Sequence, residues 1–133
     1  MLMKREIKFR AWDKYSKDPK NHKMVYPNNG DFISWHAPSN WKSCYYVMQY
    51  TGLKDKNRNE IYEGDILLDT LTKCLLIVRF GHNRNGGYNG WFAEYINIDR
   101  NGFSAINGDY GSDINSQIEV IGNIYENPEL LNQ

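Results

Sequence analysis

The chain has 133 residues, of which 41% are hydrophobic, and its 16 basic residues balance its 16 acidic residues. This length suits one domain with its own core. No apolar run approaches the roughly 18 residues of a membrane-spanning helix, and the start, MLMKRE, lacks the apolar core of a signal peptide. A zero net charge also lacks the basic surplus usual for duplex-DNA-binding proteins, whose affinity comes largely from phosphate neutralisation.

The composition favours β-structure. Aromatic residues make up 14% of the chain, whereas alanine, the strongest helix former, occurs only four times. Cys44 and Cys74 are expected to be reduced in a cytosolic protein. Cys74 begins the apolar run Cys74–Val78, where a thiol behaves as a small hydrophobic group. We therefore predict a mainly β protein.

The first fifty residues predict a β-hairpin and further short elements. Residues 5–12 alternate between two faces and predict a half-buried strand, which pairs with a returning strand at 23–26 across a polar loop. Composition predicts four more segments: a turn at 27–30, a strand at 31–35, a loop at 36–43 and a strand at 44–50.

Residues 48–68, MQYTGLKDKNRNEIYEGDILL, carry the most informative pattern in the chain. An aromatic strand ends at Thr51-Gly52, a polar loop follows, and a strand resumes at Ile61. Gly52 and Gly64 stand where tight turns require unusual backbone angles. The pattern is typical of a tight β connection that feeds the next strand.

The second half predicts a series of short strands joined by turns. The strands are expected at 64–69, 73–80, 91–98, 103–106 and 117–124. The strand at 73–80 is apolar on both faces and should be the most buried. The connections are a turn at 69–72, a flexible segment at 81–90, a tight turn at 99–102 and a loop at 107–116.

The chain ends with a short helical turn that we expect Asn127 to cap, with Pro128 at its first position. Short strands with turns about every ten residues indicate a barrel or sandwich. Residues 61–125 have the strand count and lengths of an SH3-like barrel, and residues 1–50 would be a β-hairpin elaboration packed on it. We see no linker between separate domains, so we predict a single domain over 1–133.

Three blocks resemble one known family. They are IKFRAWD at 7–13, the stretch at 48–68, and IEVIGNIYENPELL at 118–131. Together they resemble the YopX protein family, small proteins of bacteriophages and prophages with no established activity. The resemblance implies a mostly β protein with an SH3-like barrel, a phage or prophage origin, and a cytoplasmic location in the bacterial host. It implies no catalytic or binding residues at positions of this chain.

The motifs of cofactor and metal sites are incomplete. Residues 55–59 open like a calcium loop, but the required glycine and twelfth-position glutamate are replaced by Glu60 and Ile66. The glycine-rich segment at 81–87 lacks the Gly-Lys-Ser/Thr ending of a phosphate loop. The histidines and cysteines show no metal-ligand spacing. We therefore expect no cofactor and no metal.

No nucleophile motif is present either, and the candidate acid–base carboxylates are Asp65 and Glu94. Asp65 follows a glycine at the entry to a strand, where a carboxylate usually accepts backbone N–H bonds and fixes the turn. We favour that local role for Asp65. We therefore predict that the protein is not an enzyme.

The aromatic residues outnumber what one small core can hide. Exposed rings could stack on single-stranded nucleic acid or form a protein interface. The balanced charge favours a protein partner, with a homo-oligomer as one form, so we hypothesise a non-enzymatic phage accessory protein that acts as a β-barrel protein-interaction module. The alternative is nucleic-acid binding by the barrel face and the 81–90 loop. The candidate partner-binding residues are His82, Arg84, Tyr88, Trp91, Trp41 and Tyr50.

Overall fold

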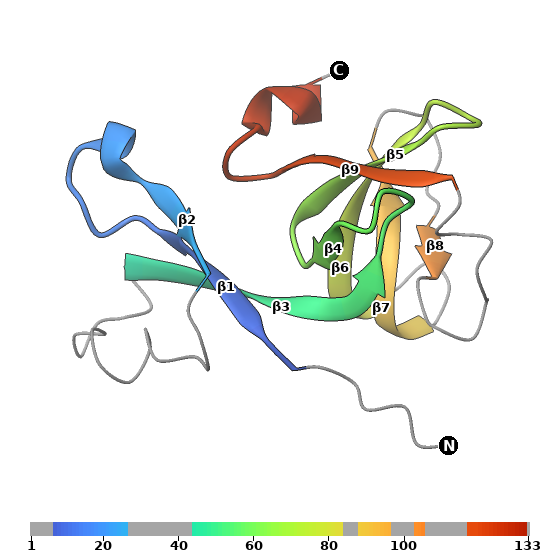
Figure 1. Ribbon diagram of the computed structural model, residues 1–133, viewed down its shortest axis with the longest axis horizontal. Helices are drawn as coiled ribbons and strands as arrows, with labels where there is room; N and C mark the ends of the chain where they lie inside the picture. Colours follow the sequence, from blue (N-terminus) through green and yellow to red (C-terminus); the bar gives the residue numbers. More distant parts are fainter. Residues whose placement is uncertain (1–6, 27–43, 84–87, 97–102, 106–116, 133) are drawn as a thin grey trace. The chain divides into compact units, whose positions relative to one another are not determined.

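The computed structural model describes residues 7–26, 44–83, 88–96, 103–105 and 117–132, and these are mostly antiparallel strands (Figure 1). Contacts within the chain define two compact units, which we call unit 1 (Met1–Tyr50) and unit 2 (Thr51–Gln133). The helical elements of the described part are the 3-10 helices η1 (Pro19–Asn21) and η4 (Pro128–Asn132). The predicted mainly β fold is confirmed. No helix in the described ranges is long and apolar enough to cross a bilayer.

Unit 1 contains β1 (Phe9–Asp13), β2 (Lys23–Val25) and the first part of β3 (Tyr45–Lys54). β1 lies between the other two strands and pairs with both in antiparallel register. The fully buried Ala11 stands opposite Val25 on one side and Val47 on the other. A small side chain between two β-branched ones lets the three pack on one face of the sheet. The predicted hairpin between the first two strands is confirmed.

β3 continues beyond the point where the sequence predicted its end. It passes Gly52, whose φ is 86°, and its last residues lie beside β4 (Glu60–Tyr62) in unit 2. The Thr51 hydroxyl donates to the Ile61 carbonyl at 2.7 Å and accepts from the Leu53 N–H at 3.1 Å. These bonds hold the strand across the glycine, so the prediction that the strand stops at Thr51-Gly52 is wrong.

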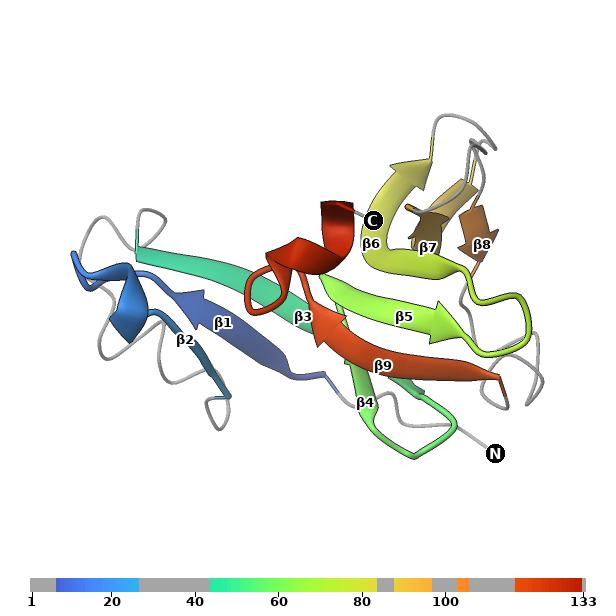
Figure 2. The same ribbon diagram turned by 90° about the horizontal axis from the view of Figure 1, so that it is seen from above.

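The remaining strands of unit 2 form one antiparallel sheet. They are β5 (Asp65–Asp69), β6 (Leu75–Asn83), β7 (Tyr88–Tyr95), β8 (Phe103–Ala105) and β9 (Ile118–Asn123). Their order is β8-β7-β6-β5-β9, so the last strand returns beside the first, as Figure 2 shows. The register of β5 with β9 shifts between Ile66 and Leu67, and such a bulge increases the twist of a strand pair.

The expected flexible connection at 81–90 is instead largely strand. β6 reaches Asn83 and β7 begins at Tyr88, with Gly81 opposite Gly90. Both glycines have φ of 132°, a conformation that is strained for other residues. The sequence suggested a loop because glycine is common in turns, but here the two glycines let a paired hairpin bend. The turn at 27–30, the strand at 31–35, the loop at 36–43, the turn at 99–102 and the loop at 107–116 lie outside the described residues.

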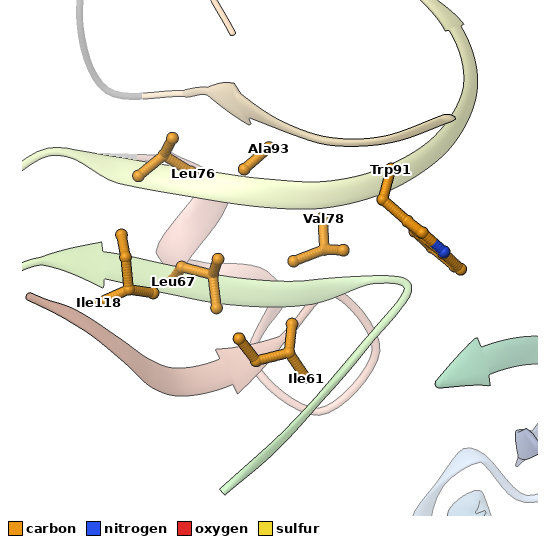
Figure 3. Packing of buried hydrophobic residues seen from close by; sticks show 7 residues of the cluster. All are labelled: Ile61, Leu67, Leu76, Val78, Trp91, Ala93 and Ile118. Carbon is orange, nitrogen blue, oxygen red and sulfur yellow. The ribbon is translucent and has the colours of Figure 1, made fainter. Parts of the chain in front are cut away.

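The core of unit 2 is formed by side chains that alternate along its strands (Figure 3). Trp91 and Ala93 share the inner face, with the partly buried Tyr95 against them, as the alternation of 91–98 predicted. On β6, all four residues from Leu75 to Val78 are buried, which agrees with an apolar strand covered on both faces. The buried members of the cluster are Ile61, Leu67, Leu76, Val78, Trp91, Ala93 and Ile118.

The C-terminal helical turn is a 3-10 turn, and Asn127 does not cap it with its side chain in the expected way. The Leu130 N–H donates to the backbone carbonyl of Asn127 at 3.1 Å. The Asn127 side-chain oxygen accepts from the Asn123 N–H at 3.2 Å instead. The amide therefore ties η4 back to the end of β9.

Candidate interaction surface

The β6–β7 hairpin presents a pair of stacked aromatic rings. Phe80 stands directly opposite Trp91 in the antiparallel register, and residues opposite each other share one face of a sheet. The ring centroids are 4.7 Å apart with an interplanar angle of 55°. Trp91 is 7% exposed and belongs to the core, whereas Phe80 is 57% exposed. Phe80 thus extends the core to the surface of unit 2.

The six candidate partner-binding residues predicted from the sequence do not share one environment in the structure. His82 and Tyr88 lie in the paired strands of this hairpin, opposite Asn89 and Asn83. Trp91 is buried on the core face, and Tyr50 is only 4% exposed. Little of either side chain is therefore exposed to a partner. Arg84 and Trp41 lie outside the described residues. A role in binding stays a prediction for all six.

Sequence reasoning missed Phe80. It stands at the end of the apolar run of β6, and the alternation from Leu76 through Val78 places it on the inner face. A pattern alone does not show that the core ends at Trp91 and leaves the next ring exposed. A sequence signal for this was nevertheless present. Arg79 and Gly81, on either side of Phe80, end the apolar run and mark the place where the strand leaves the core.

The opposite face of the hairpin carries an ion pair. Arg79 Nε donates to Glu94 Oε2 at 2.8 Å, and both side chains are substantially exposed. An exposed pair of this kind contributes about 0–1 kcal/mol to stability. Glu94 therefore has a surface partner and does not face an enclosed site, as an acid–base residue would.

Asp65 has the local role that the sequence predicted. Its buried carboxylate accepts the Tyr62 N–H at 2.7 Å and so fixes the turn between β4 and β5. Gly64, within this turn, has φ of 86°, which agrees with the backbone angles expected there.

Asp55 is more deeply placed than a solvated turn suggests, since only 3% of it is exposed. Its Oδ1 accepts the N–H groups of Asn57 and Asn59, at 2.9 Å and 2.8 Å, and its Oδ2 accepts the Val120 N–H at 2.9 Å. These N–H donors point at the oxygens that a calcium ion would need. Within the described ranges, no group of three or more His, Cys, Asp or Glu residues could hold a metal.

Two cysteines and one tyrosine carry further ionisable groups. Cys44 and Cys74 are both free thiols. Burial raises the pKa of the Tyr45 phenol above its ordinary value of 10.0, and the negative charge of Asp13, its partner in the strand register, raises that pKa further. A phenol held neutral in this way can donate a hydrogen bond, but it is a poor source of a proton for catalysis at neutral pH.

Comparison with known proteins finds similarity over nearly the whole chain. The family model described as YopX protein matches residues 8–132. The crystal structure of protein EF1440 from Enterococcus faecalis is similar, with 26% sequence identity and a TM-score of 0.53. The match covers 95% of this chain and 98% of that one. The search among curated proteins found no match.

Proposed function

This chain belongs to the YopX protein family, and on that premise we propose that it is a non-enzymatic accessory protein of a bacteriophage or prophage. In this proposal it works in the cytoplasm of the bacterial host by binding a protein partner. A second copy of the chain is the first partner to test.

We propose further that unit 2 is a small SH3-like barrel. The order β8-β7-β6-β5-β9 supports it, because four consecutive strands form a meander and the fifth returns beside the first. Glycine bends in β6 and β7 and a bulge in β5 allow such a sheet to curl. Small barrels of this type present loops and a curved sheet face to their partners.

The observation that carries the proposal is the exposed ring of Phe80 on the buried ring of Trp91. Aromatic side chains dominate the energetics of many protein interfaces. Trp91 is part of the core and holds the ring of Phe80 in place. The Phe80 side chain therefore loses little conformational entropy when a partner covers it. We expect the partner to cover this ring with an apolar group.

The charge of unit 2 also favours a protein over the alternative of nucleic acid on the barrel face and the 81–90 loop. Residues 51–133 contain seven Lys and Arg residues against twelve Asp and Glu residues. An acidic unit repels phosphates, whereas nucleic-acid platforms usually lie in a basic groove.

The test replaces Phe80 by serine and uses Leu71→Ser as the matched control. Leu71 is 75% exposed and lies in the turn between β5 and β6, so it is an equally accessible apolar side chain elsewhere on unit 2. Tagged wild-type and variant chains would be captured from phage-infected or lysogenic cells, and the co-purified proteins quantified by mass spectrometry. Light scattering of the pure proteins would report self-association.

We expect Phe80→Ser to reduce the recovered partner, or the self-association, about tenfold, which corresponds to a loss of about 1.4 kcal/mol of binding free energy. Leu71→Ser should leave both unchanged. Thermal unfolding would verify that both variants are folded. A Phe80→Ser chain that retains every partner, or a wild-type chain that is monomeric and captures no protein, would refute the proposal.

A further inference from the structure

The zero net charge of the chain conceals a strong separation between its two units. Residues 1–50 contain nine Lys and Arg residues against four Asp and Glu residues, whereas residues 51–133 contain seven against twelve. The formal charges are therefore +5 for unit 1 and −5 for unit 2. Such asymmetry indicates that unit 1 by itself has the electrostatic character of a polyanion-binding protein.

Three exposed lysines of unit 1 have no ion pair among the residues that the structure describes. Lys17, Lys20 and Lys23 are exposed, and the structure shows no ion pair for them within the described residues. The two acidic side chains nearby accept backbone N–H groups. Asp13 Oδ1 accepts from Tyr15 at 2.9 Å, and Asp18 Oδ1 accepts from Lys20 at 3.0 Å.

One face of the unit 1 sheet combines positive charge with aromatic rings. Trp12 and Tyr46 stand opposite each other in the register of β1 and β3, so they share a face. The ammonium group of Lys14 lies 3.7 Å from the centroid of the Tyr46 ring, and that of Lys8 lies 4.9 Å from the Tyr50 ring. Tyr46 is 43% exposed. A cation over an accessible ring marks a position where a flat, electron-poor group can also stack.

We propose that this end of the unit 1 sheet binds single-stranded nucleic acid, with a base stacked on Tyr46 and the phosphates bound by Lys14 and by three exposed lysines in or next to the connection from β1 to β2, Lys17, Lys20 and Lys23. Lys23 begins the edge strand β2 opposite Asp13, so it projects from the face of the sheet away from Tyr46 and binds a phosphate beyond that edge. The Lys14 ammonium leaves the Tyr46 ring as the base arrives and contacts the adjacent phosphate. Single strands fit this surface better than duplexes, since only an unstacked base can present its face to the ring. Acidic peptides would satisfy the lysines but not the ring.

The experiment measures fluorescence anisotropy of a labelled oligothymidylate of about 16 nucleotides, which matches the upper range of small single-strand sites. The full-length chain is titrated at several salt concentrations. Four phosphate contacts predict a slope of about −3 for the logarithm of affinity against the logarithm of salt concentration. A duplex of the same length and polyglutamate serve as competitors.

Two variants separate charge from stacking. Replacing Lys17, Lys20 and Lys23 together by glutamine should make the salt slope shallower by about 2. Tyr46→Leu should weaken binding about tenfold at each salt concentration and leave the slope unchanged. The matched control replaces Lys54, Lys56 and Arg58 by glutamine, which removes the same charge from exposed positions of unit 2. This control should bind like the wild type.

Circular dichroism would confirm that each variant keeps the wild-type fold. The proposal is overturned if the wild type shows no salt-sensitive binding, or if the unit 2 control weakens binding as much as the unit 1 variant. It is equally overturned if Tyr46→Leu binds as tightly as the wild type. Competition by polyglutamate or duplex that equals competition by unlabelled oligothymidylate would identify a general polyanion surface and refute it too.

Discussion

Asp55 joins two parts of unit 2 that lie far apart in the chain. Its carboxylate holds the loop to Asn59 through two backbone N–H groups, and it holds β9 through Val120, which is 65 positions away in the chain. The backbone of the same loop adds a bond from the Lys56 N–H to the Ile118 carbonyl at 3.0 Å. One buried carboxylate thus fixes where the closing strand lies.

We predict that Asp55→Ala lowers the free energy of unfolding by about 3 kcal/mol, because it leaves buried N–H groups without acceptors. Asp18→Ala is the control, since Asp18 caps η1 from an exposed position and should cost about 1 kcal/mol or less. Urea denaturation followed by circular dichroism measures both. Equal losses for the two variants would show that the bond to β9 contributes nothing.

At the scale of elements, the junction between β9 and η4 depends on a glycine packed against an amide. A Cβ on Gly122 would stand 2.7 Å from the side-chain carbon Cγ of Asn127. Asn127 lies there because its side-chain oxygen accepts the Asn123 N–H. The Asn123 oxygen in turn accepts the N–H groups of Tyr125 and Glu126, at 3.0 Å and 2.8 Å. Two asparagines therefore close the turn, and the glycine leaves room for it.

We expect Gly122→Ala to destabilise the protein by about 1–3 kcal/mol, the usual cost of overpacking. In an Asn127→Ala background the side-chain oxygen and Cγ are removed and only the Cβ of residue 127, 3.1 Å away, stays close, so Gly122→Ala should cost less there. A double-mutant cycle of thermal or urea unfolding measures this coupling. If the effects of the two substitutions on the free energy of unfolding are additive, the Asn127 amide moves aside without loss of stability, which would contradict the prediction.

At the scale of the whole molecule, the opposite charges of the two units favour attraction between copies. The basic unit 1 of one copy and the acidic unit 2 of another are electrostatically complementary, at +5 and −5. Complementary charge accelerates encounter and sets orientation, and salt screens it. This gives the proposed homo-oligomer a specific dependence on ionic strength.

We predict that the mass measured by light scattering falls toward that of one chain between about 0.01 M and about 0.15 M salt, as the screening length drops from about 30 Å to about 8 Å. Changing Lys17, Lys20 and Lys23 to glutamate should abolish the low-salt association. The same change at Lys54, Lys56 and Arg58 makes unit 2 more acidic and should preserve it. A mass that is independent of salt, or equal effects of the two variants, would contradict charge-driven association.

Local patterns predicted most of the described strands. The alternation around Trp91 placed that residue with Ala93 and Tyr95 on one inner face, and a glycine before Asp65 indicated a carboxylate that fixes a turn. Both follow from interactions between neighbours in the chain or across one strand. Errors occurred at glycines: Gly52 and Gly81 were interpreted as ends of strands, yet both strands continue because they pair with the strand that follows, as Gly81 does with Gly90 and Thr51 with Ile61.

The amino-acid sequence alone determined that the chain is mainly β, where its first hairpin and its closing strand lie, and that it resembles the YopX protein family. These properties depend on side-chain alternation and turn chemistry, which act over a few residues. Only the tertiary structure decided that Asp55 is buried against β9, that Phe80 is exposed on Trp91, and that the charges divide between two units at Tyr50. Burial and charge separation depend on which segments of the chain meet in the folded protein. A local sequence pattern does not specify those contacts.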